Sequence, residues 1–577
     1  MTRTSGVLER ARSELPFLVI AAFSGAALLF LGRGLTFYND EWRWIAFDGG
    51  LIDYFRPHNE HWSTIPLLLY RGTFHFVELH SYLPYLAAVV AMHLAAVSGA
   101  YVLMRRRLPP LPSTLLALPL ALLGVGGENL FWAFQTGFVG SVAFGLWALV
   151  VVERRSRYGT PATSALLLCS LMCSGMGLVM VIAVFLRAIL DPGIRSRASS
   201  VVVPVIAFIA WFALVGHRVD PTYRPEPAGP LDASVFTVRG AGRITQAMMG
   251  LDLIPAGLVI GVASFAALCV VALRSQRRRP GRPLALASLV SLLALYAVLG
   301  VARAGLGADY TDKSRYMYVA AFLLVIAVAD LVPRSVLRMP RERRAVVVAG
   351  LVALVFVLGV VGNVERVFQS RADFEEVADV TRAFVSLAVA HEGEPWIDPD
   401  ARFALTLPPR ELTETVAHHE FPLGGESVPT LRSAANIEAR DFALLLLVGN
   451  RFHVEPPVSA TVPLELHASG AVGTEVVHDS EGCLRVGSSG SVEAPKVDLR
   501  VRGGTRIRAR SSSAEVLFLR LSRGTPPFRG MEVVLPRREA KDIVIPDLEG
   551  LWDLSLAARV LSGRLTLCAL RSVSTAT

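Results

Sequence analysis

The sequence predicts an α-helical polytopic membrane protein with a C-terminal β-sandwich-like domain. Of its 577 residues, 53% are hydrophobic and only 18% are charged. Several apolar runs reach about 18 residues or more, the length that crosses the hydrocarbon core of a bilayer. From about residue 364 the apolar runs stop, and short segments that alternate apolar and polar residues follow between turn signals, as in antiparallel strands.

About 11 membrane spans are expected from these apolar runs. Residues 163–190 allow two interpretations, one long helix or two short helices that meet at "SGMG" (174–177). The expected spans, with two short helices in this region, are 15–36, 82–104, 112–126, 137–152, 161–174, 176–190, 199–217, 247–273, 283–301, 316–333 and 345–363.

Arginine clusters set the expected orientation. They fall in every second loop, at 105–107, 153–157, 187–197, 274–282 and 334–344. Because cytoplasmic loops of membrane proteins are enriched in Lys and Arg, the pattern predicts a cytoplasmic N-terminus and an extracytoplasmic C-terminus. It also favours two short helices in 163–190, since a single helix would move the later clusters outside. This pattern accounts for much of the net charge of +9 and argues against a nucleic-acid partner.

The predicted domains follow from the same changes of composition. Residues 1–363 form the transmembrane domain, 364–480 an extracytoplasmic linker with mixed helix and strand, and 481–577 the β-sandwich-like domain. The first outer loop, 37–80, mixes aromatic, apolar and charged residues in the manner of interfacial helices. Other outer loops are expected at 126–135, 218–246 and 303–315. Cys483 and Cys568 lie near the ends of the strand-rich segment, outside the cell, and we predict a disulfide between them.

Carboxylates beside the membrane are the first candidates for chemistry, because charge is costly in hydrocarbon. Asp40 and Glu41 follow the first span directly, in "FYNDEWRW" (37–44). Neighbouring residues point in different directions, so we expect only one of the pair to face a given cavity. The alternative is that both are solvated helix-end charges within an aromatic belt.

Two further outer segments add acids and histidines. "RPHNEHWS" contributes His58, Glu60 and His61, and "GGEN" contributes Glu128. Imidazole and carboxylate groups can bind a divalent cation such as Mg²⁺ or Mn²⁺, alone or as a metal–pyrophosphate complex. The alternative is that the histidines hydrogen-bond the loop backbone and orient the carboxylates. The sequence leaves the requirement for a metal open.

A late outer loop supplies the cations. Arg303 ends one expected span, and "DYTDKSRYMYV" (309–319) places Lys313, Arg315 and Tyr316 at the start of the next. Cations beside an apolar wall suit a lipid-linked phosphate, to which Arg offers a bidentate fork and Lys a point charge. The alternative is that these side chains only anchor a helix at the headgroups.

These features together resemble the integral-membrane GT-C glycosyltransferases, which take sugars from polyprenyl-phosphate donors. The resemblance lies in the acidic pair after the first span, the long first outer loop, the short middle helices, the "SRY" of 314–316 and the C-terminal extracytoplasmic domain. "HNEHWSTIPLLLYR" and "ENLFWAFQTGFVGS" also look similar to uncharacterised multipass proteins of actinobacteria.

The resemblance implies a role for each candidate residue. Asp40, with Glu41 as second choice, corresponds to the catalytic base, and Arg315 to the residue that holds the donor phosphate. Arg303, Lys313 and Tyr316 would assist it, and Glu60 and Glu128 match a second acid in location only. The His-rich "PHNEHW" departs from the family pattern.

The expected function is therefore an inverting hexosyl or pentosyl transfer in the bacterial inner membrane, in cell-envelope synthesis. The expected partners are a polyprenyl-phosphate sugar, membrane lipids and an extracytoplasmic glycan, lipid or protein acceptor. A ligase or polymerase of lipid-linked glycans, a transporter or flippase of such glycans, and a non-catalytic scaffold are the alternatives.

Overall fold

The computed structural model describes residues 2–572 except 155, 219–227, 253, 279–282, 333–358, 404–406, 420, 422–436, 459–460, 489–494, 523–527, 548–550 and 559–560. The chain divides into two units. We call Met1–Leu35 with Phe47–Glu375 the helical unit, and Thr36–Ala46 with Glu376–Thr577 the strand-rich unit. Each unit is described by itself.

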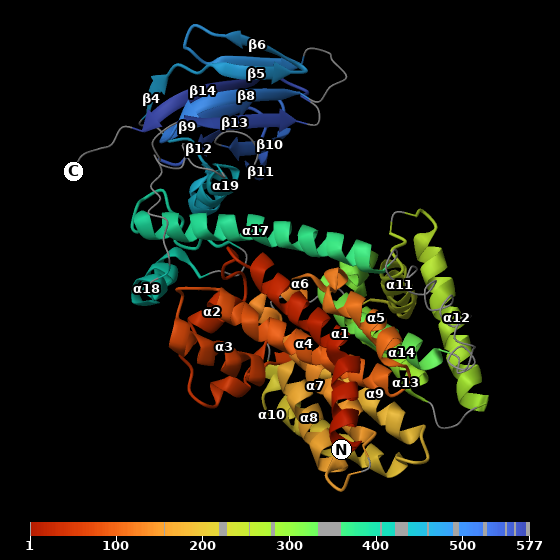
Figure 1. Cartoon of the computed structure of the whole chain (residues 1–577). Helices are drawn as coiled ribbons and strands as arrows, with labels where there is room; N and C mark the ends of the chain where they lie inside the picture. The colour runs from red at the N-terminus through yellow and green to blue at the C-terminus, as the bar shows by residue number, and fades with distance from the viewer. Residues whose placement is uncertain are drawn as a thin grey trace. The chain divides into compact units, whose positions relative to one another are not determined.

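Apolar helices build the helical unit (Figure 1). Within the described residues, seven helices are long and apolar enough to cross a membrane, and three shorter apolar helices accompany them. The predicted span 345–363 lies largely outside the described residues. The bundle consists of α1 (Thr2–Leu31), α4 (Leu83–Arg105), α5 (Pro110–Ala121), α7 (Thr136–Val152), α8 (Gly159–Cys173), α9 (Gly177–Ile189), α10 (Val202–Leu214), α11 (Pro230–Met248), α12 (Gly257–Arg278), α13 (Leu284–Arg303) and α14 (Ser314–Leu331).

The stretch 163–190 forms two short helices, as the arginine pattern favoured. α8 ends at Cys173 and α9 begins at Gly177, and Ser174 between them has extended backbone angles, φ −170° and ψ 162°. A Cβ at position 177 would lie 2.6 Å from the backbone N of Leu171. Only glycine therefore allows the two helices to meet this closely.

One predicted loop contains a long helix, and the span after it starts later than predicted. Residues 218–246 were expected to form an outer loop and 247–273 a span, whereas α11 covers Pro230–Met248 and α12 starts only at Gly257. α11 is not strongly apolar, because Arg239 and Arg243 lie within it, so hydropathy alone did not reveal it as a helix. Small residues nevertheless let it pack closely on its neighbours. A Cβ at Gly300 of α13 would lie 2.7 Å from the carbonyl O of Ala233 in α11.

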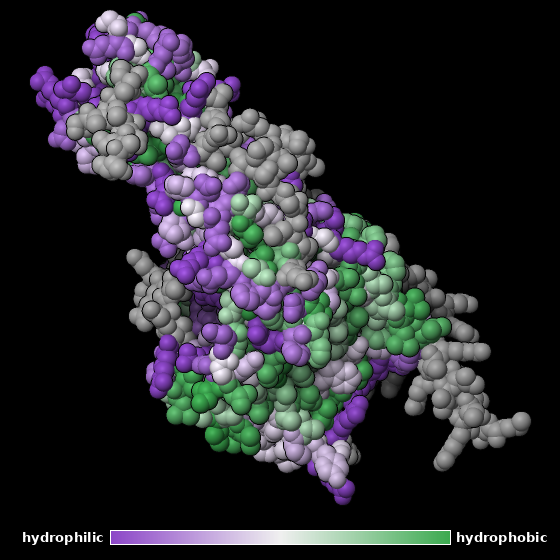
Figure 2. All heavy atoms as spheres, turned by 90° about the vertical axis from the view of Figure 1, so that its left-hand side faces the viewer, coloured by the Kyte–Doolittle hydropathy of each residue, from purple (hydrophilic) through white to green (hydrophobic). Residues whose placement is uncertain are grey.

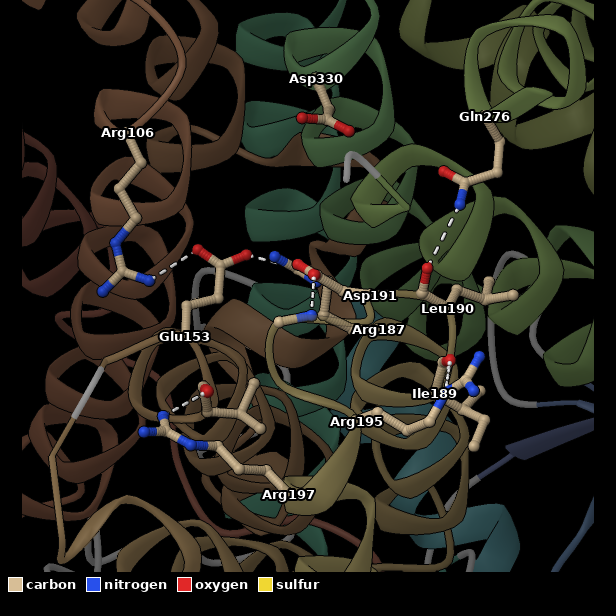
Figure 3. Close-up of polar contacts among 12 residues, drawn as sticks. Arg106, Glu153, Arg187, Ile189, Leu190, Asp191, Arg195, Arg197, Gln276 and Asp330 are labelled. Atoms are coloured by element: carbon tan, nitrogen blue, oxygen red, sulfur yellow. Dashed lines mark hydrogen bonds and ion pairs between the residues drawn. The ribbon is translucent and has the colours of Figure 1, made fainter. Parts of the chain in front are cut away.

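Three arginine-rich loop regions meet at one end of the helical unit (Figure 3). Glu153, just after α7, accepts hydrogen bonds from Arg106 at 2.8 Å and from Arg187 of α9 at 2.7 Å. Arg107 Nε donates to Asp330 of α14 at 2.7 Å. We call this set the arginine network; it comprises Arg106, Arg107, Glu153, Arg187, Asp191 and Asp330. The network places the loops after α4, α7 and α9 at the same end, as the alternation of arginine clusters predicts.

Much of the surface of the helical unit is hydrophobic. On the face shown in Figure 2, hydrophobic side chains form a broad green area over the helices, whereas the strand-rich unit is mainly purple. Phe23 and Phe30 of α1 and Ile206 of α10 are among the side chains that are more than half exposed. Exposed apolar side chains of this size on long apolar helices suit a lipid environment.

The segment 37–80 is helical only in part. Interfacial helices were expected in this loop, but between residues 41 and 55 the helical parts are limited to α2 (Glu41–Ile45) and a 3₁₀ turn, η1 (Asp53–Phe55). A two-stranded hairpin, β1 (Pro57–His58) and β2 (His61–Trp62), follows. α3 (Thr64–Val77) is the expected amphipathic helix, and it exposes Leu68 and Phe76 while it buries Leu67 and Phe74.

Two antiparallel sheets dominate the described part of the strand-rich unit. One has the order β11–β10–β13–β8–β5, and the other β3–β12–β9–β14–β7–β6, with β4 also paired to β14. Their bounds are β3 His453–Glu455, β4 Thr461–Leu464, β5 Ala468–Val472, β6 Thr474–His478, β7 Leu484–Ser488, β8 Lys496–Arg502, β9 Thr505–Ser511, β10 Glu515–Ser522, β11 Phe528–Leu535, β12 Ala540–Val544, β13 Leu551–Ala558 and β14 Leu565–Ser572.

Alternation along these strands forms the core of a β-sandwich. In β10, Leu517, Leu519 and Leu521 are buried, and the residues between them are more exposed. Trp552 of β13 is fully buried and contributes to this core. A disulfide joins Cys483, just before β7, to Cys568 of β14. Helices α18 (Pro409–His419) and α19 (Ile437–Val448) precede the sheets, and α17 (Val361–Ala390) contributes to both units.

Candidate functional site

The hairpin β1–β2 presents the His-rich segment of the helical unit. Its register pairs Pro57 with Trp62 and His58 with His61, and Asn59 at the tip has a positive φ of 51°. Asn tolerates this left-handed conformation better than most residues. Trp62 stacks on Trp211 of α10, with ring centroids 5.2 Å apart and an interplanar angle of 3°. The hairpin is therefore fixed against the helical bundle, with Glu60 at its exposed tip.

Two arginines from the ends of consecutive helices lie opposite these acids. Arg303, the last residue of α13, forms an ion pair with Glu60. Arg315, in the first turn of α14, donates to Glu128 at 3.3 Å and to the hydroxyl of Tyr310 at 3.0 Å. Arg303 and Arg315 thus each lie beside a predicted acid, although the partners are 243 and 187 residues apart in the chain.

Further hydrogen bonds hold Glu128 beside the start of α14. Glu128 begins the short helix α6 (Glu128–Phe131), and its backbone N donates to Ser314 Oγ at 3.1 Å. The side chain of Asn129 donates to the carbonyl of Ser314 at 3.4 Å. Gln135 donates to the Glu128 carboxylate at 3.4 Å. Glu128 and Arg315 are therefore held together by the backbone as well as by their charges.

Aromatic rings line the same cluster. Arg315 Cζ lies 5.4 Å from the ring centroid of Tyr316, a cation–π distance. Phe138 of α7 contacts both Tyr316, at 6.2 Å between centroids, and His61, at 5.6 Å. Lys313 is exposed, and its Nζ lies 5.5 Å from the Tyr310 ring.

The electrostatics of His61 reflect how close these groups lie. Burial lowers the pKa of His61 to about 4; Glu60 opposes this shift, and the positive charges of Arg303 and Arg315 reinforce it, as does His58. The imidazole is therefore neutral near pH 7 and has one donor and one acceptor nitrogen. We call the group Glu60, His61, Glu128, Arg303, Arg315 and Tyr316 the arginine–carboxylate cluster.

The acidic pair that opened the first outer loop belongs to the strand-rich unit. Asp40 immediately precedes α2 and is 5% exposed, and Glu41 is fully buried. A carboxylate oxygen of Glu41 accepts a hydrogen bond from the backbone N of Tyr38 at 2.7 Å. The pair is therefore not a set of solvated helix-end charges.

The tryptophans beside the pair are buried. An aromatic belt at the membrane interface was one interpretation of this segment, but Trp42 and Trp44 are 0% and 3% exposed. Trp42 contacts Phe37 and, from the C-terminal half of the chain, Phe421, with centroids 5.9 Å apart. These rings thus help to tie the segment Thr36–Ala46 into the strand-rich unit.

Some hydrogen-bond partners of the arginine–carboxylate cluster were not predicted from the sequence. Tyr310, Ser314 and Gln135 are neutral, and no charge or spacing marks them, although Tyr310 and Ser314 lie in the segment that supplied Arg315. Within the described ranges, no group of three or more His, Cys, Asp and Glu side chains is arranged to hold a metal ion.

Comparison with known proteins gives distant structural similarity. No family model matches the sequence, and no curated protein shows significant similarity to it. The fold is similar to a crystal structure of ArnT from Cupriavidus metallidurans bound to undecaprenyl phosphate, with a TM-score of 0.41 and 14% identity over 70% of this chain and 88% of that chain. It is also similar to the arabinofuranosyltransferase AftD from Mycobacteria, with a TM-score of 0.32 and 9% identity over 97% of this chain and 59% of AftD. Similarity at this level does not assign an activity to the chain.

Proposed function

We propose that this chain is a membrane glycosyltransferase that transfers a sugar from a polyprenyl-phosphate donor to an extracytoplasmic acceptor. The observation that carries the proposal is the meeting of Arg303 and Arg315, from the ends of two apolar helices, in one cluster with two acids. Guanidinium groups bind phosphate with two parallel hydrogen bonds. The apolar helices from which they project suit a polyprenyl tail.

The proposed role of the two arginines is to bind the phosphate and to stabilise it as it leaves. In the structure each guanidinium is neutralised by a carboxylate, Glu60 or Glu128. A bound phosphate would replace these carboxylates as the partner of the arginines. Glu60 or Glu128 would then be free on the acceptor side. As the bond from sugar to phosphate breaks, negative charge grows on the phosphate oxygen, and fixed positive charge lowers the barrier.

Asp40 is the proposed base. It would take the proton of the acceptor hydroxyl while that oxygen attacks the anomeric carbon, and polyprenyl phosphate would leave from the opposite face with inversion. Full burial and the hydrogen bond from Tyr38 favour a structural role for Glu41, which leaves Asp40 as the better candidate of the two.

A ligase or polymerase of lipid-linked glycans is the second candidate. The observation in its favour is that His61 interacts electrostatically with His58, Arg303 and Arg315. Such an enzyme would take a polyprenyl-pyrophosphate glycan. Activity with pyrophosphate-linked donors alone, and not with phosphate-linked sugars, would favour this candidate.

The test is transfer by the purified full-length protein in lipid nanodiscs. A panel of radiolabelled polyprenyl-phosphate hexoses and pentoses is supplied with cell-envelope acceptors, in EDTA and in Mg²⁺ or Mn²⁺. We expect transfer that Asp40→Asn lowers by at least about 100-fold while undecaprenyl phosphate still binds. Full activity in Asp40→Asn would remove the base assignment. Absence of both transfer and polyprenyl-phosphate binding in the wild type would remove the function.

A further inference from the structure

A charged stripe runs along α11 beside the arginine–carboxylate cluster. Arg239, Arg243 and Gln246 follow one another at spacings of four and three residues, which puts them on one face of the helix. Small residues bring α11 close to its neighbours: a Cβ at Gly240 would meet Tyr296 of α13, and one at Gly242 would meet Val262 of α12. α11 is thus held at a fixed distance from α13, the helix that ends at Arg303.

Arg243 reaches from this stripe to the segment before Arg315. Its Nε donates to the carboxylate of Asp312 at 3.0 Å. Asp312 is the last residue of the 3₁₀ turn η7 (Ala308–Asp312), and the hydroxyl of Thr311 also donates to it, at 2.9 Å. Both charged side chains are about one-quarter to one-third exposed, 24% for Arg243 and 31% for Asp312.

Arg243 is itself oriented by other partners. Its Nη1 donates to Gln246 at 2.7 Å and lies 3.7 Å from Asp252. Asp252 also forms an ion pair with Arg366 of α17, which donates to the carbonyl of Ala247 at 3.4 Å. The guanidinium of Arg243 is therefore fixed by side chains from α11 and from the turn that follows it.

The segment that Arg243 holds has little regular structure of its own. Between α13 and α14 lie only two short 3₁₀ turns, with Gly307 at a φ of 101° between them. Short 3₁₀ turns have poor hydrogen-bond geometry and little intrinsic stability. The position of Tyr310, which accepts a hydrogen bond from Arg315, thus depends on side-chain anchors such as Asp312.

We propose that Arg243 is a positioning residue of the donor-phosphate site. Through Asp312 it fixes η7, and through η7 it fixes the place of Tyr310 and the orientation of the Arg315 guanidinium. The inference rests on the proposed function, because it assigns Arg243 to the same site. Misplacement of a binding group by about 1 Å can reduce its effect by 10- to 100-fold.

The chain offers a matched control on the same helix and the same turn. Arg239 pairs with Asp309 at 2.5 Å, but the Asp309 side chain is 93% exposed. Ion pairs this open to solvent contribute little. Arg239→Gln therefore removes a positive charge one helical turn from Arg243. It leaves the contact between Arg243 and Asp312, which anchors η7, in place.

The experiment measures the affinity of the nanodisc-embedded full chain for undecaprenyl phosphate, with thermal stability read in parallel. Arg243→Gln and Asp312→Asn are each expected to weaken binding by about 10-fold, and the double variant no further, since both break one contact. Arg243→Lys should recover part of the loss. Arg239→Gln and Asp309→Asn should stay within about twofold of the wild type.

The outcomes separate the two proposals. If the wild type binds undecaprenyl phosphate and Arg315→Ala loses it, but Arg243→Gln stays within twofold, the positioning role is wrong and the proposed function stands. If the wild type does not bind this lipid, the proposed function is wrong, and the inference with it. If Arg243→Gln does not fold, Arg243→Lys and Asp312→Asn decide, because both keep the bulk of the side chain.

Discussion

Arg315 and Asp330 occupy the two ends of α14 and belong to different polar clusters. Arg315 pairs with Glu128, and Asp330 accepts hydrogen bonds from Arg107 and from the backbone N of Ala285 at the start of α13. α14 has 18 residues, which is about 27 Å of helix, close to the thickness of the hydrocarbon core. α13 and α14 thus each run from the arginine network to the candidate site.

Arg315 is the residue whose loss should damage activity most among the cations. Arg315→Ala is expected to lower kcat/KM for transfer by at least about 100-fold, because the guanidinium proposed to bind the donor phosphate is lost. Arg315→Lys keeps the charge but not the bidentate geometry, and a loss of about 10-fold is expected. Initial rates at varied donor concentration give kcat/KM for each of the two variants.

Arg56→Ala serves as the control for Arg315. Arg56 lies just before the hairpin β1–β2 and is 72% exposed, and among the described residues its acidic partner is the nearby Asp53. The Arg56→Ala variant should keep a transfer rate close to that of the wild type. Donor affinity within twofold of the wild type in Arg315→Ala would exclude a phosphate-binding role for Arg315.

His61 should make the stability of the protein depend on pH below neutrality. Its pKa in the folded protein is about 4, below the ordinary value of 6.5, so the unfolded chain binds more protons between these values. The contribution of His61 is complete above about pH 6.5 and is lost as the pH falls towards 4. The slope is at most about 1.4 kcal/mol per pH unit, the value for one proton.

Thermal unfolding between pH 4 and pH 7 measures this dependence. His61→Gln should lower the slope of stability against pH by up to the value for one proton. His75→Gln, at an exposed histidine of α3, serves as the comparison. Equal slopes in the wild type and His61→Gln would show that the surroundings of His61 do not disfavour its charged form.

Hydropathy and arginine spacing were enough to predict most of the helical unit. The break at "SGMG" was predictable because glycine and serine interrupt an apolar run whose length alone was ambiguous. Helix α11 was not predictable, because Arg239 and Arg243 lower its hydropathy. Their partners, Asp309 and Asp312, lie some 70 residues away in sequence.

The candidate site was predictable by residue type but not by pairing. Arg303 and Arg315 were predicted from their positions at span ends, and Glu60 and Glu128 from their positions in outer loops. No local pattern links Arg303 to Glu60 across 243 residues. The burial of Trp42 was also invisible, because one of its partners, Phe421, comes from the C-terminal half of the chain. Such contacts arise from tertiary packing and leave no mark on the neighbouring sequence.

Glu153 should be essential to the stability of the helical unit. Burial raises its pKa, but Arg187, Arg107 and Arg106 outweigh burial, and the pKa is held below the ordinary value. Glu153→Ala leaves Arg187, which is 5% exposed, with Asp191 as its remaining acidic partner in the arginine network. Removal of one member of a buried ion pair costs about 3–5 kcal/mol. We expect a markedly lower melting temperature in nanodiscs.

Arg195→Gln provides the comparison for Glu153. Arg195 lies at the same end of the bundle but is exposed and donates only to a backbone carbonyl, that of Ile189 at 3.2 Å. Its substitution should change the melting temperature little. A similar small change in Glu153→Ala would mean that the three arginines find other partners or solvent, and that the network does not stabilise the bundle.

The disulfide between Cys483 and Cys568 should stabilise the strand-rich unit. It closes a loop of 85 residues that includes most strands of both sheets, so it restricts the unfolded chain strongly. Its removal is expected to cost about 2–4 kcal/mol. Limited proteolysis and thermal unfolding of the Cys483→Ser, Cys568→Ser double variant should show earlier loss of the C-terminal fragment, and a reductant should reproduce this in the wild type. Cys269→Ser, a free cysteine of α12, controls for loss of a thiol. Equal protection of the double variant and the wild type would mean that the two sheets retain their stability without the covalent link.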